Sequence, residues 1–333
     1  MTPKPKVVIT DYDFDDVNIE RDILEAAGAE VVTLQAKTEE DLLKHAPDCA
    51  AMINQYAYIG TKTISAMERC QVIARYGVGT DIVDVNAATK KGILVTNVRN
   101  YCTEEVADHA ISLWLAQARG LFPYNRATHE GEWRWQSASP LYRLRGQTMG
   151  IVSFGMIGQA ISRRAQAFGV DVLVFDPYLE DDAILAHDAR KVSKEELLEY
   201  SDVVMMQVPM TPDTHHFLGE DEFRAMKRNA FVVCTGRGPT IDNNALYKAL
   251  SEGWIAGASL DDPEEEPAKR KNWSPADNPL FSLPNVIVTP HAAYYSEQSI
   301  RAARTIAAQE VARVLSQQAP LFPVNNIPNY SSQ

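Results

Sequence analysis

Three side chains suited to acid–base and anion chemistry follow predicted strands in the second half of the chain. Arg237 lies in CTGRGP, Glu266 in LDDPEEEP and His291 in VTPHAAYYSEQS. Ligands of open α/β sheets bind at the carboxyl ends of strands, so we expect these groups to meet at one sheet edge. An imidazole titrates near neutral pH, a carboxylate can orient it, and a guanidinium binds anions. The pattern predicts proton transfer on an anionic substrate.

A glycine-containing turn indicates a dinucleotide site. Residues 148–169 (TMGIVSFGMIGQAISRRAQAFG) are typical of a strand, a turn and a helix. Gly155 would let the backbone approach a pyrophosphate, and Gly158 would let the helix pack closely on the strand. The positive end of the helix would attract the phosphates, although Ser153 replaces the first glycine of the fingerprint. The predicted cofactor contacts in this turn are Phe154, Gly155, Met156, Ile157 and Gly158.

Asp176 ends the next predicted strand. A carboxylate there accepts hydrogen bonds from the ribose hydroxyls of NAD and repels the extra phosphate of NADP, so NAD is the predicted cofactor. Arg163 and Arg164 follow in the helix after the turn and could weaken this preference. The alternative is a turn residue before Pro177 with no role in binding.

Short apolar segments alternate with helix-like segments along the chain, which predicts parallel βαβ units. The first series ends near residue 100, and a helix is expected over 103–122. Residues 123–147 are predicted to be an irregular connection, and a second alternating series runs from 148 to 291. A last helix, 296–317, is expected to return to the first unit. The strands are nearly continuous apolar runs, which is typical of sheets covered on both faces. The predicted fold class is therefore α/β with two doubly wound parallel sheets.

Composition excludes several classes of protein. The 333 residues suit about two domains, and 45% of them are hydrophobic. The net charge of −12 and the lack of a basic block argue against nucleic acid or an anionic membrane as a partner. Four cysteines without metal-ligand spacing predict no metal site and a reducing cytoplasm. No signal peptide or apolar run of about 18 residues is found.

The order of these motifs, with RYGVGTD at 75–81 and NYCTEEVADHA at 100–110, resembles the D-isomer-specific 2-hydroxyacid dehydrogenases over essentially the whole chain. The HAAYYSEQS segment is most similar to the branch of the C-terminal binding proteins, which are transcriptional corepressors, and their bacterial relatives. The resemblance implies a flavodoxin-like substrate domain (1–100 plus 298–333) and an inserted Rossmann NAD domain (101–297). It also implies an active site between the domains and a homodimer formed through the cofactor domain.

The resemblance assigns roles in the interconversion of a 2-oxo acid and its D-2-hydroxy acid. Arg237 would hold the substrate carboxylate and polarise the carbonyl, His291 would be the acid/base, and Glu266 would hydrogen-bond the other ring nitrogen. Glu264 and Glu265 compete for this last role, but the family pattern places the acid directly before a proline, so these two are expected to be solvated. Further implied cofactor contacts are Thr103, Val208, Pro209, Thr235, Gly236 and Asp261.

The substrate-binding candidates lie in the glycine-flanked turn at 75–79. The amides of Val78 and Gly79 would bind the substrate carboxylate, beside Arg75, Tyr76, Gly77 and Tyr294. Aromatic residues near these positions favour a medium-sized apolar or aromatic 2-oxo acid over glyoxylate, and Arg75 and Arg134 leave a phosphorylated hydroxy acid open. The alternative function is a corepressor-like, NAD-sensing dimeric module that binds other proteins. We assign no chemistry to the other histidines, among them His109, His215 and His216.

Overall fold

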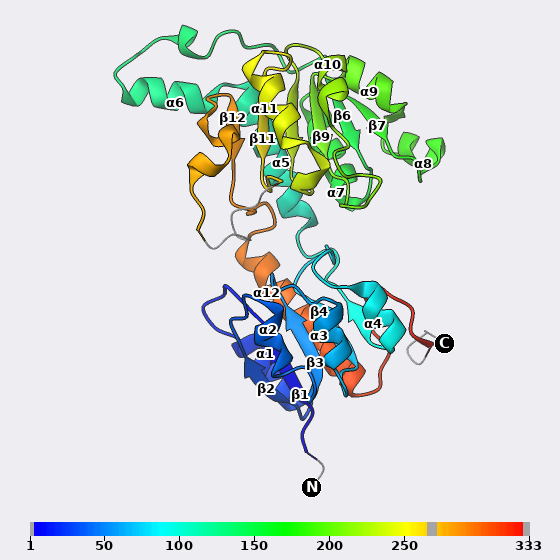
Figure 1. Ribbon diagram of the computed structural model, residues 1–333. Helices are drawn as coiled ribbons and strands as arrows, with labels where there is room; N and C mark the ends of the chain where they lie inside the picture. Colours follow the sequence, from blue (N-terminus) through cyan, green and yellow to red (C-terminus); the bar gives the residue numbers. More distant parts are fainter. Residues whose placement is uncertain (1–2, 265–271, 329–333) are drawn as a thin grey trace. The chain divides into compact units, whose positions relative to one another are not determined.

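The computed structural model describes residues 3–264 and 272–328, so Glu266 lies outside the described residues. The chain divides into two compact units, each of which Figure 1 shows as a sheet with helices around it. One unit comprises Met1–Cys102 and Ser296–Gln333, and the other comprises Thr103–Tyr295. The expected boundaries, after residues 100 and 297, lie within two residues of these breaks. Each unit is described by itself below.

The first unit contains a five-stranded, all-parallel sheet in the order β2-β1-β3-β4-β5. Its strands are β1 (Lys6–Ile9), β2 (Glu30–Thr33), β3 (Cys49–Asn54), β4 (Val72–Arg75) and β5 (Leu94–Thr96). Its helices are α1 (Asn18–Ala26), α2 (Glu39–Leu43), α3 (Thr61–Ala66), α4 (Val85–Lys91) and α12 (Glu297–Leu315). This strand order is that of flavodoxin, as the family resemblance implied.

Both faces of the first sheet are buried. Val7, Ile9 and Val72 pack in one core with side chains of α1 and α12, and Val8, Met52 and Ile73 pack in another with side chains of α2, α3 and α4. Successive strand residues point to opposite faces, so a strand covered on both sides needs apolar residues throughout. The last helix of the chain therefore belongs to the first unit, as expected.

An ion pair is buried between α1 and α12. Glu20 is fully buried, and its two carboxylate oxygens accept hydrogen bonds from Nε and Nη2 of Arg304 at 2.9 and 2.8 Å. The hydroxyl of Tyr76 donates to the same carboxylate at 3.0 Å. Burial, together with the nearby Glu20 charge, raises the pKa of Tyr76 well above its usual value. This network links the end of β4 to both helices.

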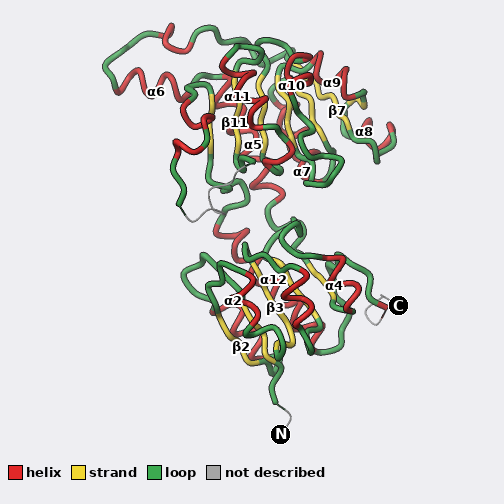
Figure 2. Tube along the Cα trace, viewed as in Figure 1, coloured by secondary structure: helices red, strands yellow, loops and turns green. Residues whose placement is uncertain are grey.

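The second unit contains a seven-stranded, all-parallel sheet in the order β12-β11-β10-β9-β6-β7-β8. Its strands are yellow in the tube of Figure 2. Its strands are β6 (Thr148–Val152), β7 (Asp171–Phe175), β8 (Arg190–Lys191), β9 (Val203–Met206), β10 (Phe231–Cys234), β11 (Gly257–Leu260) and β12 (Val286–Val288). Strands β8-β7-β6-β9-β10-β11 reproduce the Rossmann order, which reverses between β6 and β9.

Helices cover both faces of this sheet as well. The helices of this unit are α5 (Thr103–Ala118), α6 (Leu121–His129), α7 (Met156–Ala167), α8 (Asp181–Leu185), α9 (Lys194–Tyr200), α10 (Glu220–Ala225) and α11 (Asn243–Ser251). Trp114 of α5 and Ile161 of α7 share one core, and Leu197, Phe223 and Leu246 of α9, α10 and α11 share the other. Within the described ranges, no helix combines the length and apolar character that a membrane span needs.

The expected irregular connection at 123–147 is wrong in its first part. Helix α5 ends at Ala118, and the left-handed Gly120, with φ of +59°, separates it from α6. A 3-10 turn, η1 (Trp135–Ala138), follows α6. Pro123 lies in the first turn of α6, where a backbone N–H has no helical partner to lose. In the sequence, Gly120 and Pro123 predict the end of a helix. In the structure, α5 does end before Gly120, but a second helix begins directly after it.

Replacing Arg304 by methionine should lower the free energy of unfolding by about 3–5 kcal/mol, because Glu20 would then be buried without its counter-charge. Calorimetric unfolding at pH 7 measures this change. Arg301→Met, on the exposed side of the same helix, is the matched control and should change stability by less than about 0.5 kcal/mol. The double variant Glu20→Gln/Arg304→Met should recover part of the loss. Equal effects of Arg304→Met and Arg301→Met would show that Arg304 does not offset the buried charge of Glu20.

Candidate active site

The turn between β6 and α7 has the geometry that a pyrophosphate site needs. Ser153 adopts φ of +74°, a left-handed conformation that costs a serine about 1–2 kcal/mol and in which glycine is favoured. A Cβ on Gly158 would lie 2.5 Å from the carbonyl oxygen of Ser153, so only glycine lets α7 pack this closely on β6. A Cβ on Gly155 would meet nothing within 4 Å. The backbone at Gly155 is therefore open to a close approach by a ligand.

Asp176 lies directly beside this turn, after β7, and is 6% exposed. Its Oδ2 accepts a hydrogen bond from the amide of Phe154 at 2.8 Å, and its Oδ1 accepts one from the amide of Tyr178 at 2.9 Å. Each carboxylate oxygen has further lone pairs, so this fixed group can still accept bonds from ribose hydroxyls. The buried carboxylate is therefore bonded to the turn.

The two arginines that could offset this negative charge are paired with other acids. Nε and Nη2 of Arg164 contact Asp108 and Glu104 of α5 at 2.6 and 2.5 Å, and Nη2 of Arg163 lies 3.7 Å from Glu104. Both guanidinium groups thus have acidic partners on α5. Neither arginine is therefore paired with Asp176.

The remaining predicted cofactor residues of the second unit follow β9, β10 and β11 or open α5 at Thr103. The hydroxyl of Thr235 bonds the side-chain amide of Gln207, which joins the ends of β9 and β10. A Cβ on Gly236 would lie 3.1 Å from the carbonyl oxygens of Met206 and Val208. The small residue at 236 keeps these two strand ends close together, and Val208 is buried beside them.

Arg237 follows β10 and is half-buried, with Nη1 donating to the carbonyl of Gly236 at 3.1 Å. Its own carbonyl accepts a bond from the hydroxyl of Thr240 at 2.6 Å. A Cβ on Gly238 would lie 2.4 Å from the carbonyl oxygen of Asp262, so the arginine segment packs tightly on the chain after β11. Burial raises the pKa of the neighbouring Cys234 thiol to about 12, which makes it a poor nucleophile.

Asp261, at the end of β11, holds the loop that carries His291. Its Oδ1 accepts bonds from the Thr289 hydroxyl at 2.6 Å and the Ala292 amide at 2.9 Å, and its Oδ2 accepts one from the Ala293 amide at 2.8 Å. Its backbone carbonyl accepts the amide of His291 at 2.7 Å. His291 has φ of +54°, so this loop is strained and tightly bonded. Asp261 is 2% exposed, and its carboxylate accepts its hydrogen bonds from the loop that carries His291.

His291 itself is half-buried, and its ring meets Tyr294 edge-on with centroids 6.0 Å apart. The predicted partner of His291, Glu266, is outside the described residues, so that pairing stays a prediction. Glu264, the competing acid, is committed to a different histidine. Its Oε1 lies 2.5 Å from Nε2 of His216, and its Oε2 accepts the amide of Asn243 at 3.1 Å. Glu264 is therefore half-buried and bonded, not solvated as the sequence suggested.

His215 and His216, to which the sequence assigns no chemistry, join two loops of the second unit. The rings stack with centroids 3.9 Å apart, and His216 has φ of +50°. Nitrogens of both rings and an oxygen of Glu264 lie within 4.8 Å of one another, a spacing that could hold a metal ion. The short contact between His216 and Glu264 already links the loop after β9 to the loop after β11. In the sequence, the two adjacent histidines are the one local feature that could have indicated this cluster.

In the first unit, the predicted substrate turn follows β4. The side chain of Asn97 donates to the carbonyl of Val78 at 2.7 Å, and the amide of Val98 donates to the carbonyl of Gly77 at 3.0 Å. Among the residues that the structure describes, no acceptor contacts the amide of Val78 or of Gly79. These two N–H groups remain available to an anion. Gly77, with φ of +147°, provides the backbone conformation of the turn.

The side chains around this turn do not all face a ligand. The ring of Tyr76 lies in the core of the first unit against Phe14, and its hydroxyl is bonded to Glu20, so only its backbone is available for binding. Nη1 of Arg75 donates to the carbonyl of Tyr76 at 2.7 Å, close to the turn. Val78 is 45% exposed.

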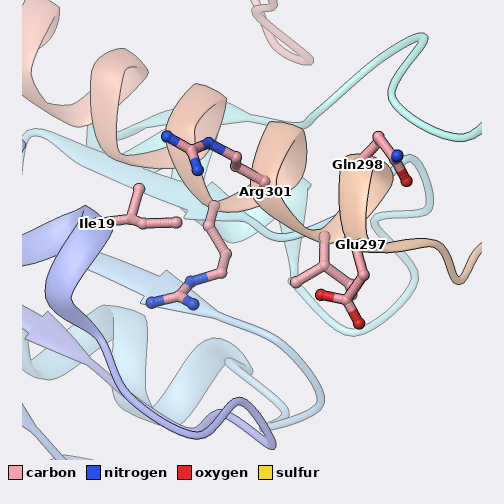
Figure 3. A pocket seen from close by; sticks show the side chains of 6 residues that line it. Ile19, Glu297, Gln298 and Arg301 are labelled. Carbon is pink, nitrogen blue, oxygen red and sulfur yellow. The ribbon is translucent and has the colours of Figure 1, made fainter.

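A separate pocket of about 330 Å³ lies between α1 and the start of α12 in the first unit (Figure 3). It is lined by Ile19, Glu297, Gln298, Ile300, Arg301 and Arg304. None of the predicted site residues that the structure describes lines it. The guanidinium of Arg304 is already bonded to Glu20 and Asp16, so it is not available to bind an anion there.

Comparison with known proteins identifies the family. The family described as "D-isomer specific 2-hydroxyacid dehydrogenase, NAD binding domain" matches residues 111–293. A glyoxylate reductase of Korarchaeum cryptofilum is 41% identical over 262 residues, which cover 78% of this chain and 77% of the relative. A D-3-phosphoglycerate dehydrogenase of Methanocaldococcus jannaschii is 37% identical over 97% of this chain, but the match spans only 60% of that longer protein.

Solved structures agree with this result. The NADPH-dependent glyoxylate/hydroxypyruvate reductase of Sinorhizobium meliloti, solved with NADP and malonate, has a TM-score of 0.85 and 29% identity, covering 99% of this chain and 100% of the other. The D-lactate dehydrogenase of Aquifex aeolicus, solved with NAD and lactic acid, has a TM-score of 0.84 and 27% identity over 93% of this chain and 95% of the other. The chain therefore belongs to the D-isomer specific 2-hydroxyacid dehydrogenase family.

Proposed function

We propose that this protein reduces a short 2-oxo acid to the D-2-hydroxy acid, with Arg237 and His291 as its catalytic residues. As a member of its family it is an NAD-dependent oxidoreductase acting on the CH–OH group of D-2-hydroxy acids. The observation that carries the residue assignment is that one parallel sheet presents both the turn at Gly155 and the loop at His291 at its carboxyl edge. Ligands of this class of sheet bind at that edge.

Each group contributes a separate part of the reaction. The fork of Arg237 would bind the substrate carboxylate and polarise the carbonyl, a charge-assisted contact worth about 1.5–3 kcal/mol. The amides of Val78 and Gly79 would bind the same carboxylate. His291 would give a proton to the carbonyl oxygen and take it back in the oxidation direction, with Glu266 holding its second ring nitrogen. When bound, NADH supplies the hydride, and the turn at 154–158 with Asp176 would hold the cofactor.

We propose a short 2-oxo acid as the substrate class. Relatives of this chain are named for glyoxylate, glycerate and 3-phosphoglycerate. The ring of Tyr76 lies in the core of the first unit, so it does not line an aromatic substrate pocket as the sequence suggested. The alternative of a corepressor-like binding module is not favoured, since the relatives compared above are named as dehydrogenases and reductases. Residence in the cytoplasm without nucleic-acid partners remains part of the proposal.

Activity tests the catalytic assignment directly. Oxidation of NADH, followed by its absorbance, should occur with at least one of the short 2-oxo acids glyoxylate, hydroxypyruvate and pyruvate, and it should be slower with phenylpyruvate. Arg237→Ala should lower kcat/KM by about 10- to 100-fold through the lost carboxylate contact, and His291→Asn should lower kcat by about 10²- to 10⁴-fold. The exposed Arg228→Ala variant is the control and should be unaffected. No turnover by the unmodified protein across the panel, or full activity of both site variants, would contradict the proposal.

Cofactor choice tests the role of Asp176. Asp176→Asn removes the charge and retains an acceptor for the Phe154 amide, so the ratio of kcat/KM with NADH to that with NADPH should fall about tenfold or more. Asp176→Ala should in addition raise KM for NADH, because the turn loses a bond. Asp171→Ala, at the exposed opposite end of the same strand, is the matched control. An unchanged ratio in Asp176→Asn would show that this carboxylate does not select the cofactor.

We propose that a second copy of this chain covers α6 and the segment that follows it. In this part of the second unit Phe122, Trp133, Trp135 and Tyr142 are 55%, 90%, 70% and 53% exposed. Figure 1 shows α6 and the following segment extending from the body of that unit. Large aromatic side chains are enriched at the cores of protein interfaces, and family resemblance implies a homodimer formed through this domain.

Replacing Trp133 and Trp135 together by serine should convert the dimer into a monomer with about the mass of one chain, 37.0 kDa before the substitutions, because the two largest exposed apolar side chains of the segment are removed. Light scattering during size exclusion measures the mass. Leu185→Ser removes another exposed apolar side chain, 67% exposed on α8, and should leave the dimer intact. A dimeric double variant, or a monomeric unmodified protein, would refute this interface.

A further inference from the structure

His109 of α5 belongs to a chain of hydrogen bonds that ends at the His291 loop. Its Nε2 lies 3.0 Å from the hydroxyl oxygen of Thr289, and that hydroxyl lies 2.6 Å from Oδ1 of Asp261. The same Nε2 is 3.6 Å from Oδ1 of Asp261, too long for a direct hydrogen bond. A helix residue 180 positions earlier in the sequence than Thr289 thus reaches the carboxylate that holds the loop.

The direction of these bonds follows from their donors. A threonine hydroxyl has one proton, and an ionised carboxylate can only accept, so Thr289 donates its proton to Asp261. The oxygen of Thr289 must then accept from His109, which requires the proton of His109 to be on Nε2. The chain therefore runs from His109 through Thr289 to Asp261, and each member fixes the orientation of the next.

The last member of the chain controls the loop geometry. Asp261 binds the amides of Ala292 and Ala293 with its side chain and the amide of His291 with its carbonyl. His291 is held at φ of +54°, a conformation that a residue with a Cβ rarely adopts without support. A rotation of the Asp261 carboxylate would weaken its bonds to the two amides directly after His291. The orientation of that carboxylate is thus a condition for the position of the imidazole.

We propose that His109 is a positioning residue: through Thr289 it orients the Asp261 carboxylate and so fixes the loop that presents His291. This inference deepens the proposed function, because it rests on His291 being the acid/base of the reaction. His109 need not touch substrate or cofactor for this role. Its side chain is 26% exposed and its Nε2 contacts are Thr289 and Asp261. The loop residue that it binds, Thr289, lies two positions before His291.

Two variants separate positioning from packing. His109→Phe keeps a flat ring without a donor, and His109→Gln keeps an N–H donor at a similar distance from the backbone. Hydrogen exchange of the peptide containing residues 289–294, measured in the cofactor-free protein, should become at least about fivefold faster in His109→Phe and return toward the original rate in His109→Gln. Ser112→Ala, which removes an exposed hydroxyl bonded only within α5, is the control and should not alter this peptide.

Kinetics and a double variant complete the test. His109→Phe should lower kcat about tenfold with a smaller change in KM for the 2-oxo acid, because a misplaced acid slows the chemical step more than binding. Because the bonds act in series, the double variant His109→Phe/Thr289→Val should be no slower than Thr289→Val alone. Additive losses, or unchanged exchange in His109→Phe, would overturn the proposal.

The two proposals fail in distinguishable ways. If the unmodified protein reduces no 2-oxo acid, the proposed function fails, and the exchange of residues 289–294 still decides whether His109 holds the loop. If the unmodified protein is active but His109→Phe changes neither exchange nor kcat, only the positioning role fails. A fall in melting temperature of His109→Phe without faster exchange in this peptide would assign His109 to packing and overturn the inference.

Discussion

The candidate site depends on the hydrogen bonds between the carboxylate of Asp261 and the loop that carries His291. This carboxylate is buried at the end of β11, and it accepts hydrogen bonds from one hydroxyl and two amides of the loop that follows β12. Burying a charge is costly unless hydrogen bonds replace the lost water, and here three donors do so. The same bonds that stabilise the charge define the conformation of the loop. The position of His291 thus follows from the hydrogen bonds that the buried carboxylate of Asp261 requires inside the second unit.

Three positions with left-handed backbone lie at the same sheet edge. Ser153, His216 and His291 all have positive φ values, between 50° and 74°, and each lies in a loop after a strand of the second unit. Such conformations persist only where surrounding bonds over-determine them, and they are common at functional sites. Asp176 binds the amide beside Ser153, Glu264 binds the ring of His216, and Asp261 binds the amide of His291. In the first two cases an acidic side chain bonds the strained segment, and in the third the backbone carbonyl of Asp261 accepts the amide of His291.

Much of the fold could be predicted from local patterns in the sequence. Alternating apolar strands and amphipathic helices indicated two parallel sheets, because strands covered on both faces need apolar residues at every position. The spacing of Gly155, Gly158 and Asp176 indicated a strand, a tight turn and a helix before any contact was known. The connection after α5 was less predictable, since Gly120 and Pro123 favour a helix end and the first turn of a helix alike.

The sequence by itself determined which residues could do chemistry and at which strand ends they lie, because strand periodicity and turn residues are local properties. Tertiary structure alone decided which side chains those residues meet. It turned Tyr76 toward Glu20, paired Glu264 with His216, and brought His109 to Thr289 across 180 residues. These pairings depend on how helices pack on the sheets and on which buried polar groups need partners. Both are set by contacts between distant segments, which no local pattern encodes.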